Sequence, residues 1–259
     1  GGSYHGRRLG TVGNAGALSF NYFKIITAGE GGALLTNDRK IYEKSLIHPD
    51  SSAVLFFGDQ INALSEEEFC GTEYRVSEIT GAILREQLKR LDGILADCRA
   101  VKKRMINELS DVCAFAPSHD AEGDCGTTLA FRFENEAEAL AFRDGLRNAG
   151  FTDAVRPFDT GKHVFTHWTP ILAHRGAAHP AMDPFKMEAN RGLNMNYAPD
   201  MCGKTLDLLA RTVYMKNAAK KIVREILRPL AGGMVDDYSA PSDLNVTLEP
   251  YGPTDCIKG

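Results

Sequence analysis

The sequence predicts an α/β fold built in two parts, and three patterns along the chain carry that prediction. Short apolar runs bounded by glycine, at residues 15–20 and 32–36, indicate two strands. Apolar residues that recur every three or four positions indicate a long helix over residues 76–109. A strand at residues 127–133 and an amphipathic helix at residues 136–148 then follow. We therefore place the boundary between the two parts near residues 110–126.

Local signals support the ends of these elements. Ser77 stands where a side chain can cap the long helix, and Gly93 is the position in it that favours a helix least. Gly150 follows the helix at 136–148 as its C′ residue.

The rest of the chain gives weaker signals. Residues 156–196 are rich in Pro, His and Gly and show no clear period. A further helix is expected at residues 218–227, and residues 231–259 are expected to form an extended or partly disordered tail.

Length and charge exclude several classes of protein. The chain has 259 residues and a formal net charge of −4, which gives no general electrostatic reason to bind nucleic acid or an anionic membrane. No apolar run is long enough to span a bilayer, and the first ten residues lack the apolar core of a signal peptide. We expect a cytoplasmic protein that binds neither nucleic acid nor membrane.

The cysteines and histidines do not form a recognisable metal motif. The six cysteines are scattered singly, so neither a structural zinc site nor a disulfide framework is predicted, and reduced thiols are expected. His163 and His167 are loosely spaced and no carboxylate or cysteine accompanies them in motif form. We predict no metal site.

Lys24 is the most informative single residue. It lies a few residues beyond an apolar strand, in a loop that contains aromatic residues and ends in several glycines. A lysine in such a place can be partly desolvated, which lowers its pKa and makes its amine a nucleophile. Ser19, at the strand end, can donate its hydroxyl to a phosphate. A solvated surface lysine is the alternative, because lysine is rarely buried.

The motifs around Lys24 resemble the signature of the DegT/StrS family, which are sugar aminotransferases that depend on pyridoxal phosphate (PLP) and have fold type I. The matches run in the family's order through most of the chain. They are Tyr4-His5-Gly6-Arg7 with Gly10 and Gly13, Ser19-Phe20-x-x-x-Lys24-x-x-x-x-Gly29-Glu30-Gly31-Gly32, Glu73-Tyr74-Arg75-Val76-Ser77-Glu78-Ile79 with Gln87-Leu88, and residues 205–213.

The resemblance implies a role for several residues. Lys24 would form the Schiff base with PLP and shuttle a proton between substrate and cofactor, and Ser19 would hold the cofactor phosphate. Tyr74 and Arg75 lie in a segment that approaches the partner's active site in the family, so a homodimer and contacts with substrate are implied. His163 lies in a loop that faces substrate in the family. A lysine at position 24 favours transamination over dehydration, since the dehydrating branch carries histidine there.

Two features depart from the family's pattern. Glu73 stands where the family usually has an asparagine near the cofactor phosphate, and a carboxylate there would repel the phosphate unless it turns away or pairs with Arg75. The family's N-terminal region, which supplies an aspartate to the pyridine nitrogen, would precede Gly1. We therefore expect an upstream segment or a companion chain to supply it.

The resemblance also implies the whole architecture. Residues 1–110 would be the C-terminal part of a large PLP-binding domain with a mainly parallel sheet, and residues 111–230 a small α+β domain. The expected reaction moves an amino group from glutamate or glutamine to a keto sugar, either nucleotide-linked or a sugar acid, for surface polysaccharides or glycosylated metabolites. The alternative is a non-catalytic fragment, or a dimerisation or binding module of the same family.

Overall fold

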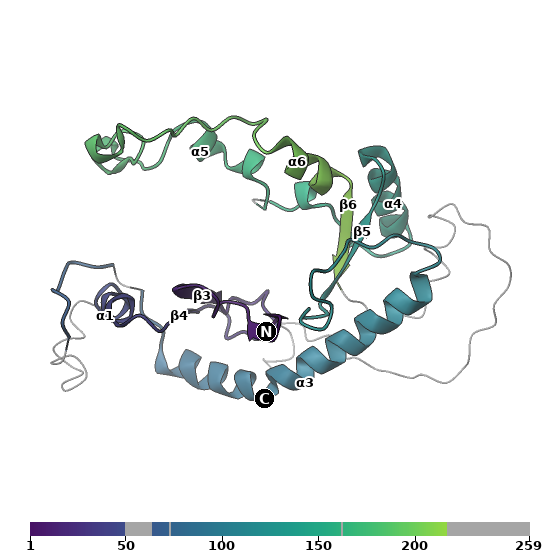
Figure 1. Ribbon diagram of the computed structural model, residues 1–259, viewed down its shortest axis with the longest axis horizontal. Helices are drawn as coiled ribbons and strands as arrows, with labels where there is room; N and C mark the ends of the chain where they lie inside the picture. Colours follow the sequence, from purple (N-terminus) through teal and green to yellow (C-terminus); the bar gives the residue numbers. More distant parts are fainter. Residues whose placement is uncertain (50–63, 73, 162, 217–259) are drawn as a thin grey trace. The chain divides into compact units, whose positions relative to one another are not determined.

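The computed structural model describes residues 1–49, 64–72, 74–161 and 163–216, and it divides into two compact units (Figure 1). The first unit comprises Gly1–Val101 and Ser118–Thr127, and the second comprises Lys102–Pro117 and the described residues from Thr128 onward. We describe each unit by itself.

Two antiparallel hairpins begin the first unit. Strand β1 (Ser3–Tyr4) pairs with β2 (Arg7–Arg8), and β3 (Ala15–Ser19) pairs with β4 (Gly32–Thr36). The two strands expected from sequence are confirmed, the first one residue shorter than predicted.

The mainly parallel sheet expected for this part is not found among the described residues, where all three strand pairs are antiparallel. For β3 and β4, the physical reason is that the chain turns straight back after β3, whereas a parallel pair needs a crossover connection, usually through a helix. The loop between β3 and β4 contains no helix.

Helix α1 (Arg39–Ile47) follows β4 and was not predicted. Its signal is Asp38, whose carboxylate accepts hydrogen bonds from the backbone N–H groups of Lys40 and Ile41 at 2.8 and 3.2 Å. An aspartate that satisfies two free N–H groups is a strong N-cap. Ile47 and Glu43 are the buried residues of this helix.

Helix α3 (Glu78–Leu109) confirms the long helix, which begins two residues later than predicted. Ser77 caps it as expected, since its Oγ accepts a hydrogen bond from the N–H of Thr80 at 3.1 Å. The helix buries Leu95, Met105 and Leu109, but several apolar side chains of its first turns are exposed, namely Ile79, Ile83 and Leu88.

The second unit has a core of two strands and a helix. Strands β5 (Thr128–Arg132) and β6 (Thr212–Lys216) pair antiparallel, and α4 (Glu136–Asn148) packs on them. Gly150 has a φ of +94°, which confirms it as the residue that ends α4 in the left-handed region. The buried apolar side chains of this core are Leu129, Phe131, Ala139, Phe142, Leu146, Val213 and Met215.

The regular elements described between α4 and β6 are short helices and helical turns. They are η2 (Pro157–Asp159), η3 (Phe165–His167), α5 (Thr169–Leu172), η4 (Pro180–Met182), η5 (Glu188–Asn190) and α6 (Gly203–Ala210). The turns within residues 156–196 have only three or four residues each, too few to show a period, which explains why no element was predicted there. The helix expected at 218–227 and the tail at 231–259 lie outside the described residues.

Candidate functional site

The loop between β3 and β4 carries the two residues that the sequence singled out. Ser19 is the last residue of β3, and Lys24 follows in the loop. The loop is closed at its base because the N–H of Phe20 donates to the carbonyl of Gly31 at 2.8 Å. The N–H of Lys24 donates to the carbonyl of Asn21 at 3.0 Å, so Lys24 sits in a tight turn directly after the strand.

The side chains of this turn face solvent. Ser19 and Lys24 are both exposed, and the neighbouring Tyr22 and Phe23 are 54% and 69% exposed, with ring centroids 3.9 Å apart. The partial desolvation expected for Lys24 is therefore not provided by the described residues. An amine, a hydroxyl and two aromatic faces are thus presented together on one short segment.

The second half of the loop is held against α3. The side-chain amide of Gln87 donates to the carbonyl of Thr27 at 3.3 Å. The hydroxyl of Thr27 in turn donates to the carbonyl of Phe20 at 2.9 Å and accepts the N–H of Gly29 at 3.0 Å. A side chain at Gly31 would contact Thr80. The loop that carries Lys24 is therefore anchored on both sides, by β3 and by the start of α3.

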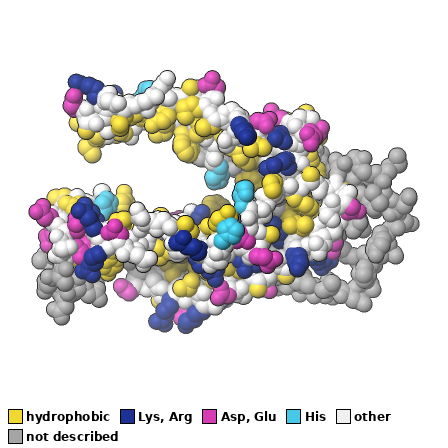
Figure 2. All heavy atoms as spheres, viewed as in Figure 1, with side chains coloured by type: hydrophobic (Ala, Val, Ile, Leu, Met, Phe, Trp, Pro, Cys, Tyr) yellow, Lys and Arg dark blue, Asp and Glu magenta, His cyan; other side chains and the backbone are white. Residues whose placement is uncertain are grey.

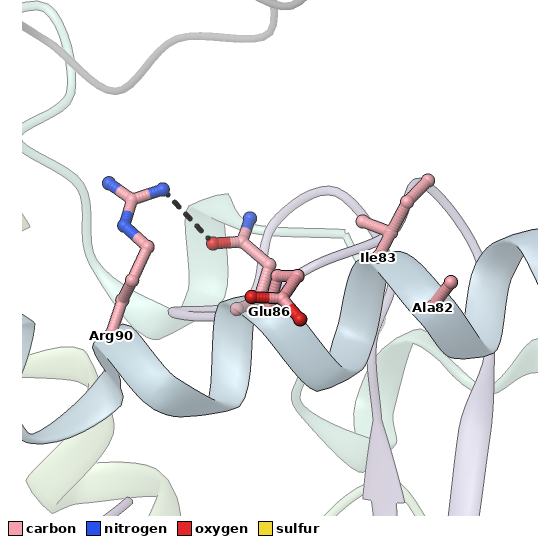
Figure 3. Close-up of a pocket in the computed structure, with 5 residues that line it drawn as sticks. Ala82, Ile83, Glu86 and Arg90 are labelled. Atoms are coloured by element: carbon pink, nitrogen blue, oxygen red, sulfur yellow. Dashed lines mark hydrogen bonds between the residues drawn. The ribbon is translucent and has the colours of Figure 1, made fainter.

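A shallow open depression lies along α3 beside this anchor. Ala82, Ile83, Glu86, Gln87 and Arg90 line it, and Figure 3 shows the first three and Arg90 along the helix. The guanidinium of Arg90 donates to the amide oxygen of Gln87 at 3.3 Å. A hydrogen bond from Lys89 is the main cause that lowers the pKa of Glu86. Gln87 therefore both lines this depression and holds the loop, and the depression is open to solvent.

Tyr74 and Arg75 precede α3 and are exposed. The ring of Tyr74 stacks on that of His48 with centroids 6.0 Å apart and an interplanar angle of 15°. The N–H of Tyr74 donates to the carbonyl of Pro49 at 3.1 Å. These contacts join Tyr74 to the end of α1 and not to the loop of Lys24. Glu73, which departs from the family's pattern, lies outside the described residues.

His163 belongs to the second unit, where it follows η2. Its ring is exposed, and Nδ1 lies 2.9 Å from the hydroxyl oxygen of Thr160. Sequence reasoning missed Thr160 as the partner of this ring. The sequence feature that could have predicted this contact is a threonine three residues before a histidine, because a tight turn brings side chains at that spacing together.

The described residues also lack two features of other protein classes. No helix there is long and apolar enough to cross a bilayer. Within the same residues, no three side chains of His, Cys, Asp or Glu group as metal ligands would.

Comparison with known proteins gives several relatives. The chain is 30% identical to the L-glutamine:2-deoxy-scyllo-inosose aminotransferase of Streptoalloteichus tenebrarius over 53% of its own length and 32% of that protein. It is 31% identical to the GDP-perosamine synthase of Escherichia coli O157:H7 over 43% of its own length and 30% of that protein. The chain spans about a third of the length of these relatives.

A solved structure shares the fold. The GDP-4-keto-6-deoxy-D-mannose-3-dehydratase of E. coli, solved with bound hydrated PLP, matches 89% of this chain and 57% of that one with a TM-score of 0.64 and 20% identity. This likeness confirms the α/β fold class expected from sequence. The model of the DegT/DnrJ/EryC1/StrS aminotransferase family matches residues 1–207. The chain belongs to the DegT/DnrJ/EryC1/StrS aminotransferase family.

Proposed function

We propose that the protein to which this chain belongs is a PLP-dependent aminotransferase that moves an amino group from glutamate or glutamine to a keto sugar. The observation that carries the proposal is the pair Ser19 and Lys24, a hydroxyl and an amine exposed on one anchored turn after β3. Two relatives support it, since one is an L-glutamine:2-deoxy-scyllo-inosose aminotransferase and the other a GDP-perosamine synthase.

The donor set of this turn fits two ends of PLP. The cofactor has an aldehyde, which a lysine amine attacks, and a phosphate, which hydroxyl and backbone N–H groups bind. Lys24 would hold the aldehyde end and Ser19 the phosphate end. The Oγ of Ser19 lies 3.5 Å from the N–H of Asn21, at the limit of a hydrogen bond, so this hydroxyl remains available to a ligand.

In this proposal the cofactor and the protein contribute different parts of the reaction. Bound PLP supplies an electron sink that stabilises negative charge on the substrate carbon. Lys24 Nζ would hold the cofactor until the amine of the amino acid takes its place; the freed lysine amine would then accept a proton from the amino-acid carbon and, with the sugar bound, deliver a proton to the former carbonyl carbon. The hydrogen bond from Gln87 to the carbonyl of Thr27 would steady the loop that carries this amine. Such support matters because proton transfer needs heavy atoms within about 3 Å.

The remaining residues serve the substrates in this proposal. Arg75 offers a planar guanidinium suited to a carboxylate or phosphate, and Tyr74 offers a ring and a hydroxyl. His163 binds a polar group of the sugar. The keto sugar is nucleotide-linked or a sugar acid, and the product enters surface polysaccharides or glycosylated metabolites. The enzyme acts in the cytoplasm as a homodimer whose partner completes the site with Tyr74 and Arg75.

Cofactor trapping tests the proposal directly. PLP is titrated into the purified chain and into Lys24→Ala, with absorbance recorded, followed by borohydride reduction and peptide mapping. We expect a yellow adduct on Lys24 in the wild type and its loss in Lys24→Ala. Lys103→Ala, which removes an exposed lysine on α3, serves as the matched control and keeps the adduct.

The opposite result has a definite meaning. An adduct spread equally over surface lysines in the wild type and in Lys24→Ala contradicts a catalytic role for this chain alone. It would favour the alternative, a dimerisation or binding module of the same family. A trapped adduct on Lys24 makes it worthwhile to screen keto sugars with glutamate and with glutamine.

A further inference from the structure

The hydroxyl of Thr160 lies between two atoms, and their chemistry fixes where the protons are. Its oxygen is 3.0 Å from the carbonyl oxygen of Pro157 and 2.9 Å from Nδ1 of His163. A carbonyl oxygen has no proton to give, so the hydroxyl must donate its single proton to Pro157. The contact with His163 then needs a proton from the ring, which places that proton on Nδ1.

We infer that Thr160 is a positioning residue that holds neutral His163 in the Nδ1–H tautomer and leaves its Nε2 as a hydrogen-bond acceptor. His163 is exposed, and in the described part of the chain its Nε2 has no hydrogen-bond partner. The group that this nitrogen recognises is therefore a donor, such as a sugar hydroxyl. This last step rests on the proposed function, whereas the tautomer does not.

Backbone hydrogen bonds also link Thr160 and His163 to their neighbours. The N–H of Thr160 donates to the carbonyl of Pro157 at 3.3 Å, and the N–H of His163 donates to the carbonyl of Thr160 at 3.4 Å. Thr160 thus contacts His163 through both its main chain and its side chain. If the ring of His163 rotates away, it loses the hydrogen bond to the Thr160 hydroxyl.

Ion pairs anchor the start of the same turn. The carboxylate of Asp159 accepts a hydrogen bond from Arg143 at 2.8 Å and one from the backbone N–H of Arg156 at 3.1 Å. Arg156 is 8% exposed and also donates to Glu136 at 2.6 Å. Burial raises the pKa of Asp159, but the bonds from both arginines outweigh it and lower that pKa to about 2. The anchor therefore stays charged throughout the range in which histidine titrates.

His167 provides an internal comparison. Its Nδ1 contacts the carbonyl oxygen of Gly161, which can only accept. His167 therefore also carries its proton on Nδ1, but for a reason independent of Thr160. A change at Thr160 should alter one of these two rings and spare the other.

Nitrogen-15 NMR of the histidine rings tests the inference on the full chain at about pH 8, above the ordinary histidine pKa of about 6.5. In the wild type we expect both His163 and His167 in the Nδ1–H form. In Thr160→Val, His163 should change to the Nε2–H form, which neutral histidine favours in water, while His167 is unchanged. Thr160→Ser, which keeps the hydroxyl, should restore the wild-type spectrum of His163.

Two outcomes would overturn the inference. One is His163 in the Nε2–H form in the wild type, a measurement that needs no variant to fold. The other is a Thr160→Val protein in which His163 keeps its Nδ1–H form. The experiment uses neither PLP nor sugar, so its failure leaves the aminotransferase proposal standing. Failure to trap PLP on Lys24 would equally leave the tautomer standing.

Discussion

Glu43 shows how one buried carboxylate joins separate segments of the first unit. Its side chain is 1% exposed and forms an ion pair with Arg39 one turn earlier on α1. Its Oε2 accepts hydrogen bonds from the N–H and hydroxyl of Ser65, both at 2.9 Å, and from the N–H of Glu66 at 3.0 Å. The hydrogen bond from Arg39 is the largest cause that lowers the pKa of Glu43 to about 2, and burial opposes it.

Glu43→Gln should reduce the free energy of unfolding at pH 7, since an amide loses the charge that Arg39 and three donors satisfy. The pKa of Glu43 is depressed in the folded state, so its contribution is full above the unfolded value of 4.5 and is lost as pH falls toward 2. Urea unfolding at several pH values should show the difference between wild type and Glu43→Gln shrinking between about pH 5 and 2.

Glu67→Gln is the matched control for this prediction. Glu67 is exposed and lies two residues beyond Ser65. We expect little effect on stability at any pH. A difference between Glu43→Gln and the wild type that stays constant down to pH 2 would show that its charge is not what stabilises the fold.

The candidate site residues illustrate what a sequence can predict at this scale. The positions of Ser19 at a strand end and Lys24 in a loop followed from local pattern, and their roles stay predictions. The stacking of Tyr74 on His48 joins residues 26 positions apart. Such a contact depends on how the chain returns to α1, and no local period encodes it.

Replacing two glycines of the first unit by alanine should change the free energy of unfolding in opposite directions. Gly93 lies in the middle of α3 with open space where a side chain would be, so Gly93→Ala should stabilise the protein by about 0.5–1 kcal/mol. Gly126 has a φ of +77°, and a Cβ there would lie 2.5 Å from the backbone nitrogen of Arg99. Gly126→Ala should therefore destabilise by at least about 1–2 kcal/mol.

Denaturant unfolding measures both changes on the same scale. The two variants make the same substitution, so any difference in sign comes from the backbone and its surroundings. A stabilising Gly126→Ala would show that the approach of the 118–127 segment to α3 is not required. A destabilising Gly93→Ala would indicate that the exposed side of α3 packs against something.

The elements that sequence missed share a physical cause. Helix α1 has nine residues, and an N-cap rather than a long period marks it. Strand β6 follows α6 after one residue, so no loop signal separates the two. The pairing of β5 with β6 joins residues 128–132 with 212–216, and that choice depends on burying one shared apolar face over α4.

Exposed apolar surface is the main feature at the scale of the whole molecule. Figure 2 shows hydrophobic side chains at the surface among charged ones. In the first unit they include Leu18, Leu34, Ile79 and Leu88, with exposed fractions from 37% to 75%. Where such side chains form a contiguous patch, they mark a region that packs on another chain or segment.

Light scattering tests the homodimer that we propose. We expect a mass of twice the 28.3 kDa of the chain, because covering the apolar side chains of the first unit removes them from water. The mass should be measured over a dilution series, since a dimer of finite affinity dissociates when diluted. A chain that stays at 28.3 kDa at the highest concentration would contradict a self-association of this segment.

The sequence by itself determined the strands around Lys24, the long helix with its cap at Ser77, helix α4 with its end at Gly150, and the family. These features are local, because a period, a cap or a motif lies within a few turns of the chain. Tertiary structure decided the antiparallel pairing of the strands and the exposure of Lys24. It also decided the hydrogen bonds that Glu43 accepts from Ser65 and Glu66, and the hydrogen bond between Thr160 and His163. Each of these depends on which groups meet when the chain folds back, and burial and hydrogen bonding between distant residues settle that choice.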